Sequence, residues 1–199
     1  KVSDYIVDFI SKLGVKHIFL ISGGGNIHLI DSVGNNHTLQ YVCNNHEQAS
    51  ATCAEGYARI TGFGVCIVTT GPGATNAITG VLGAWLDSIP LLVISGQVRR
   101  DTIEAGRITR QLGDQEINII NIVKPITKYA KTIMNPENIG YHLEKAVHMA
   151  KTGRQGPVWL DIPLDVQGSF VEKDTMKQFH PQKLSIEFEN DKQKLKKIV

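Results

Sequence analysis

The sequence predicts an α/β domain with a parallel six-stranded sheet and helices on both of its faces. Short apolar runs alternate along the chain with longer segments whose apolar residues recur at helical spacing. The runs, such as Leu91–Ser95, are apolar throughout rather than alternating with polar residues. That pattern is typical of strands covered on both faces of a parallel sheet. Glycine and proline clusters separate the two kinds of segment and mark the turns.

The first half of the chain is predicted to hold four helices and four strands. The opening helix places apolar residues three or four positions apart, with Ser3 as its N-cap and Gly14 as its stop. The next helices each begin where a strand-like run ends in polar or glycine residues. The predicted helices are Val2–Leu13, Asn26–Val33, a helix that carries Glu47 and ends near Gly62, and Ala74–Leu86. The predicted strands are His17–Ile21, Leu39–Cys43, Val65–Thr69 and Leu91–Ser95.

The second half is predicted to add two strands, two helices and a tail. Residues Arg99–Gly113 are polar and weakly patterned, which indicates a long loop with little regular structure. The elements expected after it are a short helix Glu116–Val123, a strand Ile126–Ala130, a helix Pro136–Thr152 and a strand Val158–Ile162. The apolar pattern fades past Pro163. We therefore expect one domain over residues 1–167, and a linker with the start of a missing central domain over 168–199.

Composition excludes several classes of function. The formal charge of +2, with both signs mixed, argues against a nucleic-acid partner. No apolar run is long enough to suggest a membrane-spanning helix. The three cysteines lack a Cys-x-x-Cys spacing, so we expect buried thiols and a cytoplasmic location. Histidines and cysteines show no zinc-type spacing, and no metal ligands are predicted in this chain.

Two glycine-rich turns and one glutamate are the candidate site residues. Ser22–Gly25 and Gly71–Gly73 each lie between a predicted strand and a predicted helix. Neither turn has the third glycine of a dinucleotide-binding fingerprint, which disfavours a nicotinamide-dependent dehydrogenase. Glu47 falls in the first turn of its helix, where unpaired N–H groups and the helix dipole favour a negative charge. A simple helix-capping role is the alternative for Glu47, and tight turns are the alternative for the glycines.

Several motifs resemble thiamine-diphosphate-dependent enzymes of the acetolactate synthase-like family, in their N-terminal, pyrimidine-binding domain. The matching blocks occur in the family's order and spacing, and cover most of residues 1–167. They are His46-Glu47-Gln48, Ala54–Arg59, Gly71-Pro72-Gly73-Ala74-Thr75-Asn76, Trp85–Pro90 and Gly153–Val166. Single blocks are weak evidence, whereas the ordered set is specific.

The resemblance implies a cofactor and a role for each matching residue. Glu47 corresponds to the glutamate that hydrogen-bonds N1′ of the aminopyrimidine and favours the imino tautomer, whose 4′ nitrogen takes the C2 proton. The first glycine turn lines the aminopyrimidine in the family, and the second lies against the centre of the cofactor. The residues expected to bind thiamine diphosphate are therefore Ser22, Gly23, Gly24, Glu47, Thr70, Pro72 and Asn76.

The substrate side departs from the family pattern. Ile21-Ser22-Gly23-Gly24 stands where acetolactate synthases carry Tyr-Pro-Gly-Gly, and Gly113-Asp114-Gln115-Glu116 stands for Ala-Phe-Gln-Glu. Asp114 thus replaces an aromatic residue near the substrate entrance. We expect a carboligase or decarboxylase of 2-oxo acids, with a substrate more polar than the usual pair. The expected substrate-side residues are His46, Gln48, Asp114 and Gln115.

The rest of the site is expected outside this chain. In the family a second domain holds the pyrophosphate and Mg²⁺ through Gly-Asp-Gly and a later Asn-Asn, and this chain contains no Gly-Asp-Gly. That domain belongs to the partner subunit, so we expect a homodimer or homotetramer and a fragment that is inactive alone. FAD is a possible further cofactor, as in many acetolactate synthases. An alternative is a non-catalytic assembly or FAD-binding module of the same fold.

Overall fold

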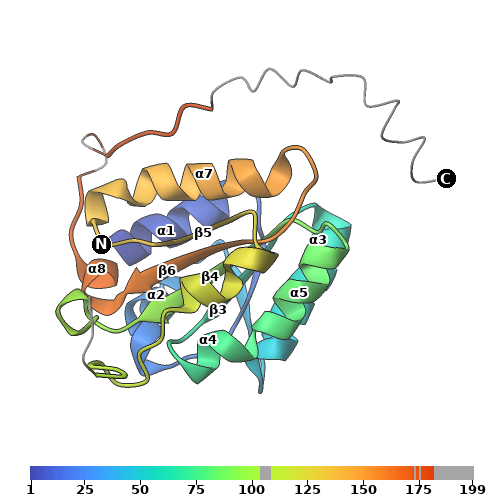
Figure 1. Cartoon of the computed structure of the whole chain (residues 1–199). Coiled ribbons are helices and arrows are strands. Elements are labelled where there is room, and N and C mark those ends of the chain that lie inside the picture. Colours follow the sequence, from blue (N-terminus) through green and yellow to red (C-terminus); the bar gives the residue numbers. More distant parts are fainter. Residues whose placement is uncertain (104–108, 173, 175, 182–199) are drawn as a thin grey trace, which may run out of the picture.

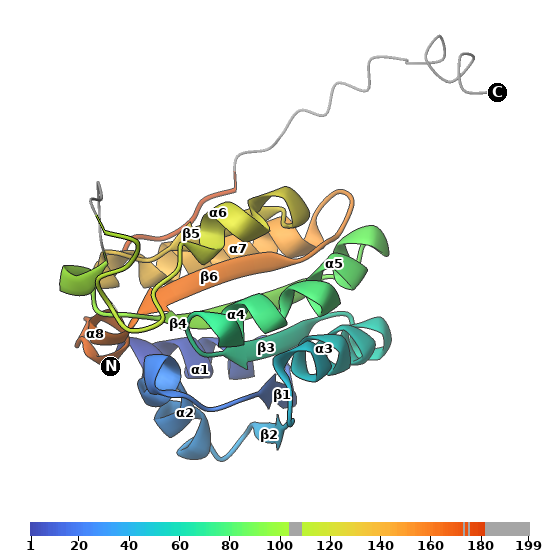
Figure 2. The same cartoon turned by 60° about the horizontal axis from the view of Figure 1, so that its bottom comes forward.

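The computed structural model describes residues 1–103, 109–172, 174 and 176–181. Six strands, all parallel, form one sheet in the order β2-β1-β3-β4-β6-β5 (Figures 1 and 2). The strands are β1 (His17–Leu20), β2 (Gln40–Cys43), β3 (Gly64–Val68), β4 (Leu91–Gln97), β5 (Tyr129–Thr132) and β6 (Val158–Pro163). The predicted α/β class with a parallel six-stranded sheet is confirmed.

Helices cover both faces of the sheet and enclose two separate hydrophobic cores. One core lies under α1 (Val2–Lys12), α2 (Ile27–Gly34), α7 (Ile139–Lys151) and α8 (Leu164–Gly168). The other lies under α3 (Glu47–Thr61), α4 (Pro72–Asn76), α5 (Ile78–Leu86) and α6 (Ile119–Val123). Figures 1 and 2 show α1 and α7 on one side of the sheet and α3 and α5 on the other. Strands β3, β4 and β6 are buried along their whole length between the two layers.

The edge strand β2 differs from the prediction of burial on both faces. All four of its residues are exposed, and Tyr41 retains 54% of its accessible surface. β2 pairs only with β1 in the described part of the chain, so its outer edge faces away from the sheet. An apolar run therefore predicted this strand correctly but not its burial, because burial depends on the neighbours the fold provides.

Several element boundaries also differ from the sequence prediction. The helix expected over Ala74–Leu86 is two helices, α4 and α5, which meet at Ala77. β5 begins at Tyr129 rather than Ile126, because Lys124–Ile126 forms the 3₁₀ turn η3 around Pro125. Lys1, not Ser3, precedes the first helix, and Ser3 is buried within it. The short helix α8, whose Val166 joins a hydrophobic core, lies where no element was expected.

Two of the three cysteines are also placed differently from the prediction. Cys66 is buried in β3, whereas Cys43 and Cys53 are exposed at the end of β2 and on α3. The exposure of both follows from the open position of β2 and of the outer surface of α3. The expectation of buried thiols was therefore wrong for Cys43 and Cys53.

The strand order places a site at one edge of the sheet. The connection from β1 leads to β2 on one side, and the connection from β3 leads to β4 on the other. The carboxyl ends of β1 and β3 thus lie beside each other where the direction of winding reverses, which is where open α/β sheets bind ligands. The two glycine turns follow these two strands. In the described part of the chain, no helix is both long and apolar enough to cross a bilayer.

Candidate active site at the carboxyl edge of the sheet

Glu47 is the first residue of α3, directly after the N-cap His46. The His46 ring nitrogen Nδ1 accepts a hydrogen bond of 3.1 Å from the backbone N–H of Gln48 and so caps the helix. His46 therefore performs the capping role that was the alternative for Glu47. The Glu47 side chain is half-buried and remains free to face the neighbouring turns.

Asn76 orients the Glu47 carboxylate from the end of α4. Its side-chain Nδ2 donates a hydrogen bond of 2.9 Å to Glu47 Oε2. The other oxygen, Oε1, lies 3.3 Å from where a Cβ on Gly73 would stand. Within the residues that the structure describes, Oε1 accepts no hydrogen bond. The carboxylate is thus held by one oxygen and offers the other beside a glycine.

The first glycine turn is folded around the buried side chain of Asn26. Asn26 Oδ1 accepts from the Gly23 backbone N–H at 2.8 Å, and its Nδ2 donates to the Ile21 carbonyl at 2.9 Å. These two bonds bend the chain directly after β1 and lead into the 3₁₀ turn η1 (Gly24–Asn26). Ser22 and Gly24 remain exposed on the outside of the turn.

Thr69, at the end of β3, brings the two glycine turns together. A Cβ on Gly23 or on Gly73 would lie 2.6 Å from atoms of the Thr69 side chain. Thr69 Oγ1 also accepts a hydrogen bond of 3.1 Å from the Gly25 backbone N–H. Sequence reasoning missed Thr69, although a polar residue ending a buried strand at this edge was an available signal.

Gly24 differs from its neighbours in having space around it. A Cβ added there would meet no atom within 4 Å, and its backbone does not need glycine's positive φ. Gly23, Gly25 and Gly73 are explained by the close approach of the two turns, whereas Gly24 is not. A side chain at Gly24 would instead occupy the open space next to the turn.

The second turn joins the cofactor-side residues to the 113–117 segment. Gly71 has a φ of 60°, and a Cβ there would lie 2.4 Å from the Gln115 carbonyl oxygen. Pro72 is exposed at the first position of α4. Thr70 is buried, and its hydroxyl donates to Gln97 Oε1 at 3.1 Å. Because its side chain is buried and bonded to Gln97, Thr70 would contact a ligand through its main chain.

The expected substrate-side residues lie at the start of α3 and in the 113–117 segment. His46 and Gln48 are exposed on either side of Glu47. Gln115 is exposed, has a left-handed φ of 55° and lies against Gly71. Asp114 is exposed and forms no hydrogen bond or ion pair with any residue the structure describes. The predicted site residues thus occupy one edge, with Asp114 at its outer limit.

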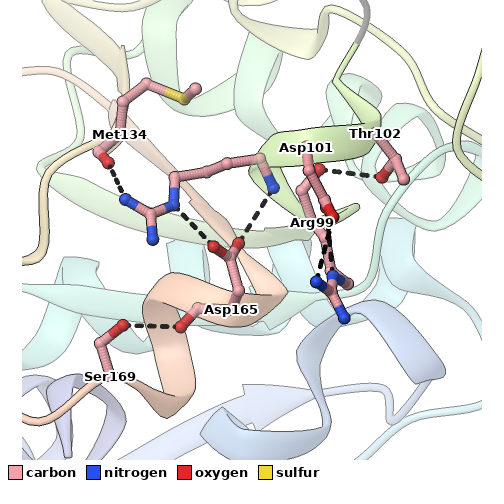
Figure 3. A network of polar contacts seen from close by, with 7 residues as sticks. Arg99, Asp101, Thr102, Met134, Asp165 and Ser169 are labelled. Atoms are coloured by element: carbon pink, nitrogen blue, oxygen red, sulfur yellow. Dashed lines mark hydrogen bonds and ion pairs between the residues drawn. The ribbon is translucent and has the colours of Figure 1, made fainter.

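An ion pair fixes the start of the long connection that follows β4 (Figure 3). The Arg100 backbone N–H and Nε donate to the two carboxylate oxygens of Asp165 at 3.0 and 2.6 Å, and Nη1 donates to the Met134 carbonyl. Although partial burial alone would raise it, these bonds from Arg100 lower the pKa of Asp165. The turn η2 (Arg100–Thr102) is thereby tied to α8, and it is the one regular element in the described part of residues 99–113, as a loop with little regular structure would have.

The arrangement fits a flat heteroaromatic ring that carries a nitrogen able to bond to a carboxylate. Glu47 Oε1 accepts no hydrogen bond from a described residue and lies 3.3 Å from where a Cβ on Gly73 would stand. No cluster of three or more His, Cys, Asp or Glu side chains suited to a metal occurs among the described residues.

Comparison with protein families decides which class of ring-binding domain this is. Residues 1–122 match the model of the thiamine pyrophosphate enzyme family, N-terminal TPP binding domain. The chain belongs to this family. Its relatives include acetolactate synthase 2 of Nicotiana tabacum, 38% identical over 87% of this chain, and the acetolactate synthase of Arthrospira platensis, 39% identical over 84%. The acetolactate synthase large subunit of Haemophilus influenzae is 38% identical over 82%.

The chain is thus an N-terminal TPP-binding domain of the acetolactate synthase-like type. The aligned regions cover 26% of the tobacco protein and 28% of each of the two bacterial proteins. The chain therefore spans about a quarter of the length of the relatives it matches. Both glycine turns, Glu47 and the segment through Gln115 lie within the residues 1–122 matched by the family model.

Proposed function

We propose that this domain binds the aminopyrimidine ring of thiamine diphosphate and that Glu47 activates the cofactor. The observation that carries the proposal is the geometry of the Glu47 carboxylate. One oxygen is fixed by Asn76 at 2.9 Å, and the other is open beside Gly73, at the edge where both glycine turns meet. A carboxylate held in this way can share a proton with a ring nitrogen rather than with water.

The proposal gives a separate role to each of the site residues of this chain. Glu47 Oε1 would hydrogen-bond N1′ of the ring, and Asn76, which donates to Oε2, would keep the carboxylate in that orientation. Ser22, Gly23 and Gly24 would lie along the ring, while Pro72 and the main chain of Thr70 would face the centre of the cofactor. When bound, thiamine diphosphate supplies a nucleophilic carbon, C2 of its thiazolium ring, for attack on a carbonyl carbon. The protein would position the ring and, through Glu47, control the proton on the ring nitrogen.

The substrate that we propose is a 2-oxo acid, handled by a carboligase or decarboxylase of the transferase or lyase class. His46, Gln48, Asp114 and Gln115 lie where they can face it. Asp114 is exposed and adds a negative charge where the family carries an aromatic residue. This charge favours a substrate with a polar or cationic group over an apolar one.

We further propose that the active unit is a homodimer or homotetramer. The pyrophosphate and Mg²⁺ would be held by the pyrophosphate-binding domain of a partner subunit, and FAD would bind outside this domain if it binds at all. The described residues contain no cluster that suits a metal ion. The domain alone would then be inactive, because it holds only half of the cofactor site.

Calorimetric titration of thiamine diphosphate and Mg²⁺ into the full-length protein tests this function. The proposal predicts saturable binding that Glu47→Ala weakens at least about tenfold, and that Glu55→Ala on the same helix leaves unchanged. Glu55 is a suitable control because its carboxylate pairs with Arg59, away from the glycine turns. The alternative, a non-catalytic assembly or FAD-binding module with a vestigial site, predicts no saturable heat in the wild type.

A further inference from the structure

A buried carboxylate, Asp161, lies on β6 and faces side chains of the neighbouring strands β4 and β5. Asp161 is 1% exposed, and its Oδ1 accepts from the Ser95 hydroxyl at 2.7 Å. Its Oδ2 accepts from Gln97 Nε2 at 3.1 Å and from the Thr132 hydroxyl at 3.0 Å. No cation pairs with it among the described residues. Asp161 is thus held by three neutral donors alone.

Three donor groups, on Ser95, Gln97 and Thr132, point to the Asp161 carboxyl oxygens. Trp159 Nε1 donates to Ser95 Oγ at 2.8 Å, so the Ser95 hydroxyl hydrogen points to Asp161. Burial raises the pKa of Asp161 to about 6, and the hydrogen bonds from Ser95, Gln97 and Thr132 oppose the rise. A buried charge without a counter-ion is a poor way to stabilise a core, so its use lies in what it orients.

Asp161 fixes the orientation of the Gln97 side chain. The Gln97 amide is 4% exposed and uses all four of its hydrogen-bonding positions. Nε2 donates to Asp161 and to the Ile117 carbonyl at 2.9 Å. Oε1 accepts from the Thr70 hydroxyl at 3.1 Å and from the Val98 backbone N–H at 2.9 Å. Because Asp161 only accepts, it forces the NH₂ group toward itself and toward Ile117.

Gln97 therefore links the two sides of the proposed site. Thr70 precedes the Gly71 turn, on the cofactor side. Ile117 lies two residues after Gln115, whose carbonyl contacts Gly71. The cofactor side has further support, since the Gly73 N–H donates to the Thr70 carbonyl and Asn76 bonds to Glu47. The 113–117 segment is linked to strand β4 of the sheet through the hydrogen bond from Gln97 to the Ile117 carbonyl.

We propose that Gln97, oriented by Asp161, is a positioning residue that holds the segment carrying Asp114 and Gln115 in register with the Gly71 turn. The inference rests on the proposed function, because it assigns that segment to the substrate side. It predicts that replacing Gln97 lowers kcat/KM for the substrate more than it lowers the rate of C2 proton exchange in the bound cofactor.

Gln97→Met in the full-length protein tests this role, with pyruvate as the substrate probe. The side chain keeps its size and loses all four hydrogen bonds. We expect kcat/KM for pyruvate to fall roughly 10- to 100-fold, because small displacements of reacting groups have effects of this order. Exchange of the C2 proton of bound thiamine diphosphate for deuterium should stay within about threefold. Asp161→Asn, which keeps the shape, should lower kcat/KM by a smaller factor and should also leave C2 exchange within about threefold.

A structural readout makes the test independent of the substrate. Amide hydrogen exchange over residues 111–118 should become at least about tenfold faster in Gln97→Met, while exchange over α3 stays as in the wild type. Thr127→Val is the matched control, because it removes a buried hydroxyl bond to the Val123 carbonyl just before β5 starts, away from the carboxyl edge. It should alter neither the kinetics nor the exchange over 111–118.

The outcomes separate this inference from the proposed function. Unchanged amide exchange over 111–118, or a parallel loss of C2 exchange and kcat/KM, would overturn the positioning role. A wild-type protein that binds no thiamine diphosphate would overturn the proposed function, while the amide-exchange comparison would still decide whether Gln97 holds the segment. If Gln97→Met fails to fold, Asp161→Asn carries the same comparison.

Discussion

Single side chains at the carboxyl edge have separable structural and functional roles. Thr69 explains Gly23 and Gly73, where a Cβ would lie 2.6 Å from its side chain, and Thr70 explains Gly25, where a Cβ would lie 3.0 Å from it. Gly24 has no such neighbour. Adjacent glycines therefore differ in role. Substitution of each one shows whether it is needed for folding, through the free energy of unfolding, or for ligand binding, through Kd.

Gly24→Ala should leave folding intact and weaken cofactor binding. Alanine at the first position of η1 meets only open space and loses less backbone entropy than glycine, so we expect unfolding free energy within about 0.5 kcal/mol of the wild type or higher. In the full-length protein the thiamine diphosphate Kd should rise about tenfold or more. Gly23→Ala is the matched comparison and should destabilise by about 1–3 kcal/mol through its clash with Thr69. Equal Kd values for Gly24→Ala and wild type would place the ring elsewhere.

Because of Asp161, the free energy of unfolding should decrease as the pH rises from about 4 to above 6. Its folded pKa, about 6, is above the ordinary value of 3.8, so the folded state binds the proton more tightly than the unfolded state does. The associated stability is fully present below about pH 4 and is lost as the pH rises through 6, by up to about 3 kcal/mol. Urea unfolding of wild type and Asp161→Asn from pH 4 to 8 measures the difference. A difference that is constant with pH would show that Asp161 does not titrate in this range.

At the scale of elements, the close packing of α3 on α5 sets where Glu47 stands. A Cβ on Gly80 would lie 2.7 Å from Ala51 Cβ and 2.9 Å from the Thr52 nitrogen. The small residues of α3 therefore permit helix approach, and α5 follows directly after α4, which carries Asn76. The distance between the Asn76 amide and the Glu47 carboxylate depends on this helix contact.

Gly80→Ala should separate the two helices, whereas Gly83→Ala one turn later should not. We expect Gly80→Ala to lower the unfolding free energy by about 1–2 kcal/mol, since backbone must move to admit the methyl group. Gly83 has open space, so alanine there should stabilise α5 by up to about 1 kcal/mol. Urea denaturation measures both. Equal stability of the two variants would contradict this account of the α3–α5 contact.

Sequence patterns predicted most elements because apolar runs and helical spacing are local properties. They did not place Ala77 as a break between two helices, nor the start of β5 after Pro125. The exposure of Tyr41 depends on β2 being an edge strand, which its own residues do not encode. Thr69, Gln97 and Asp161 were missed for a related reason. Their importance comes from contacts with residues distant in sequence, whereas Glu47 stood out through its local motif.

At the scale of the whole molecule, the domain exposes apolar side chains at the C-terminal ends of α3 and α5, away from Glu47. Ile60 on α3 is 87% exposed, and Leu86 on α5 is 64% exposed. Arg59 pairs with both Glu55 and Asp87, and the pair with Asp87 links the C-terminal ends of these two helices. Exposed apolar patches on folded domains commonly mark interfaces. This surface is our candidate for the contact between subunits.

Replacing Ile60 and Leu86 together by lysine should shift the full-length protein toward monomer. Two charges would have to be buried for the proposed subunit contact to form, which is unfavourable. Sedimentation velocity at micromolar concentration measures the change. Phe170→Lys is the control, because Phe170 is 88% exposed and lies outside α3 and α5. An unchanged sedimentation coefficient for the double variant would assign the contact to another surface.

The most direct test of the account is the exchange of the C2 proton of bound thiamine diphosphate for deuterium, followed by NMR in the full-length protein. Glu47→Gln keeps the size of the side chain and removes the carboxylate that Asn76 orients. The account predicts that exchange slows by two or more orders of magnitude, while Glu55→Gln, on the same helix, exchanges as the wild type does. Wild-type exchange in Glu47→Gln, with cofactor demonstrably bound, would contradict the role assigned to Glu47.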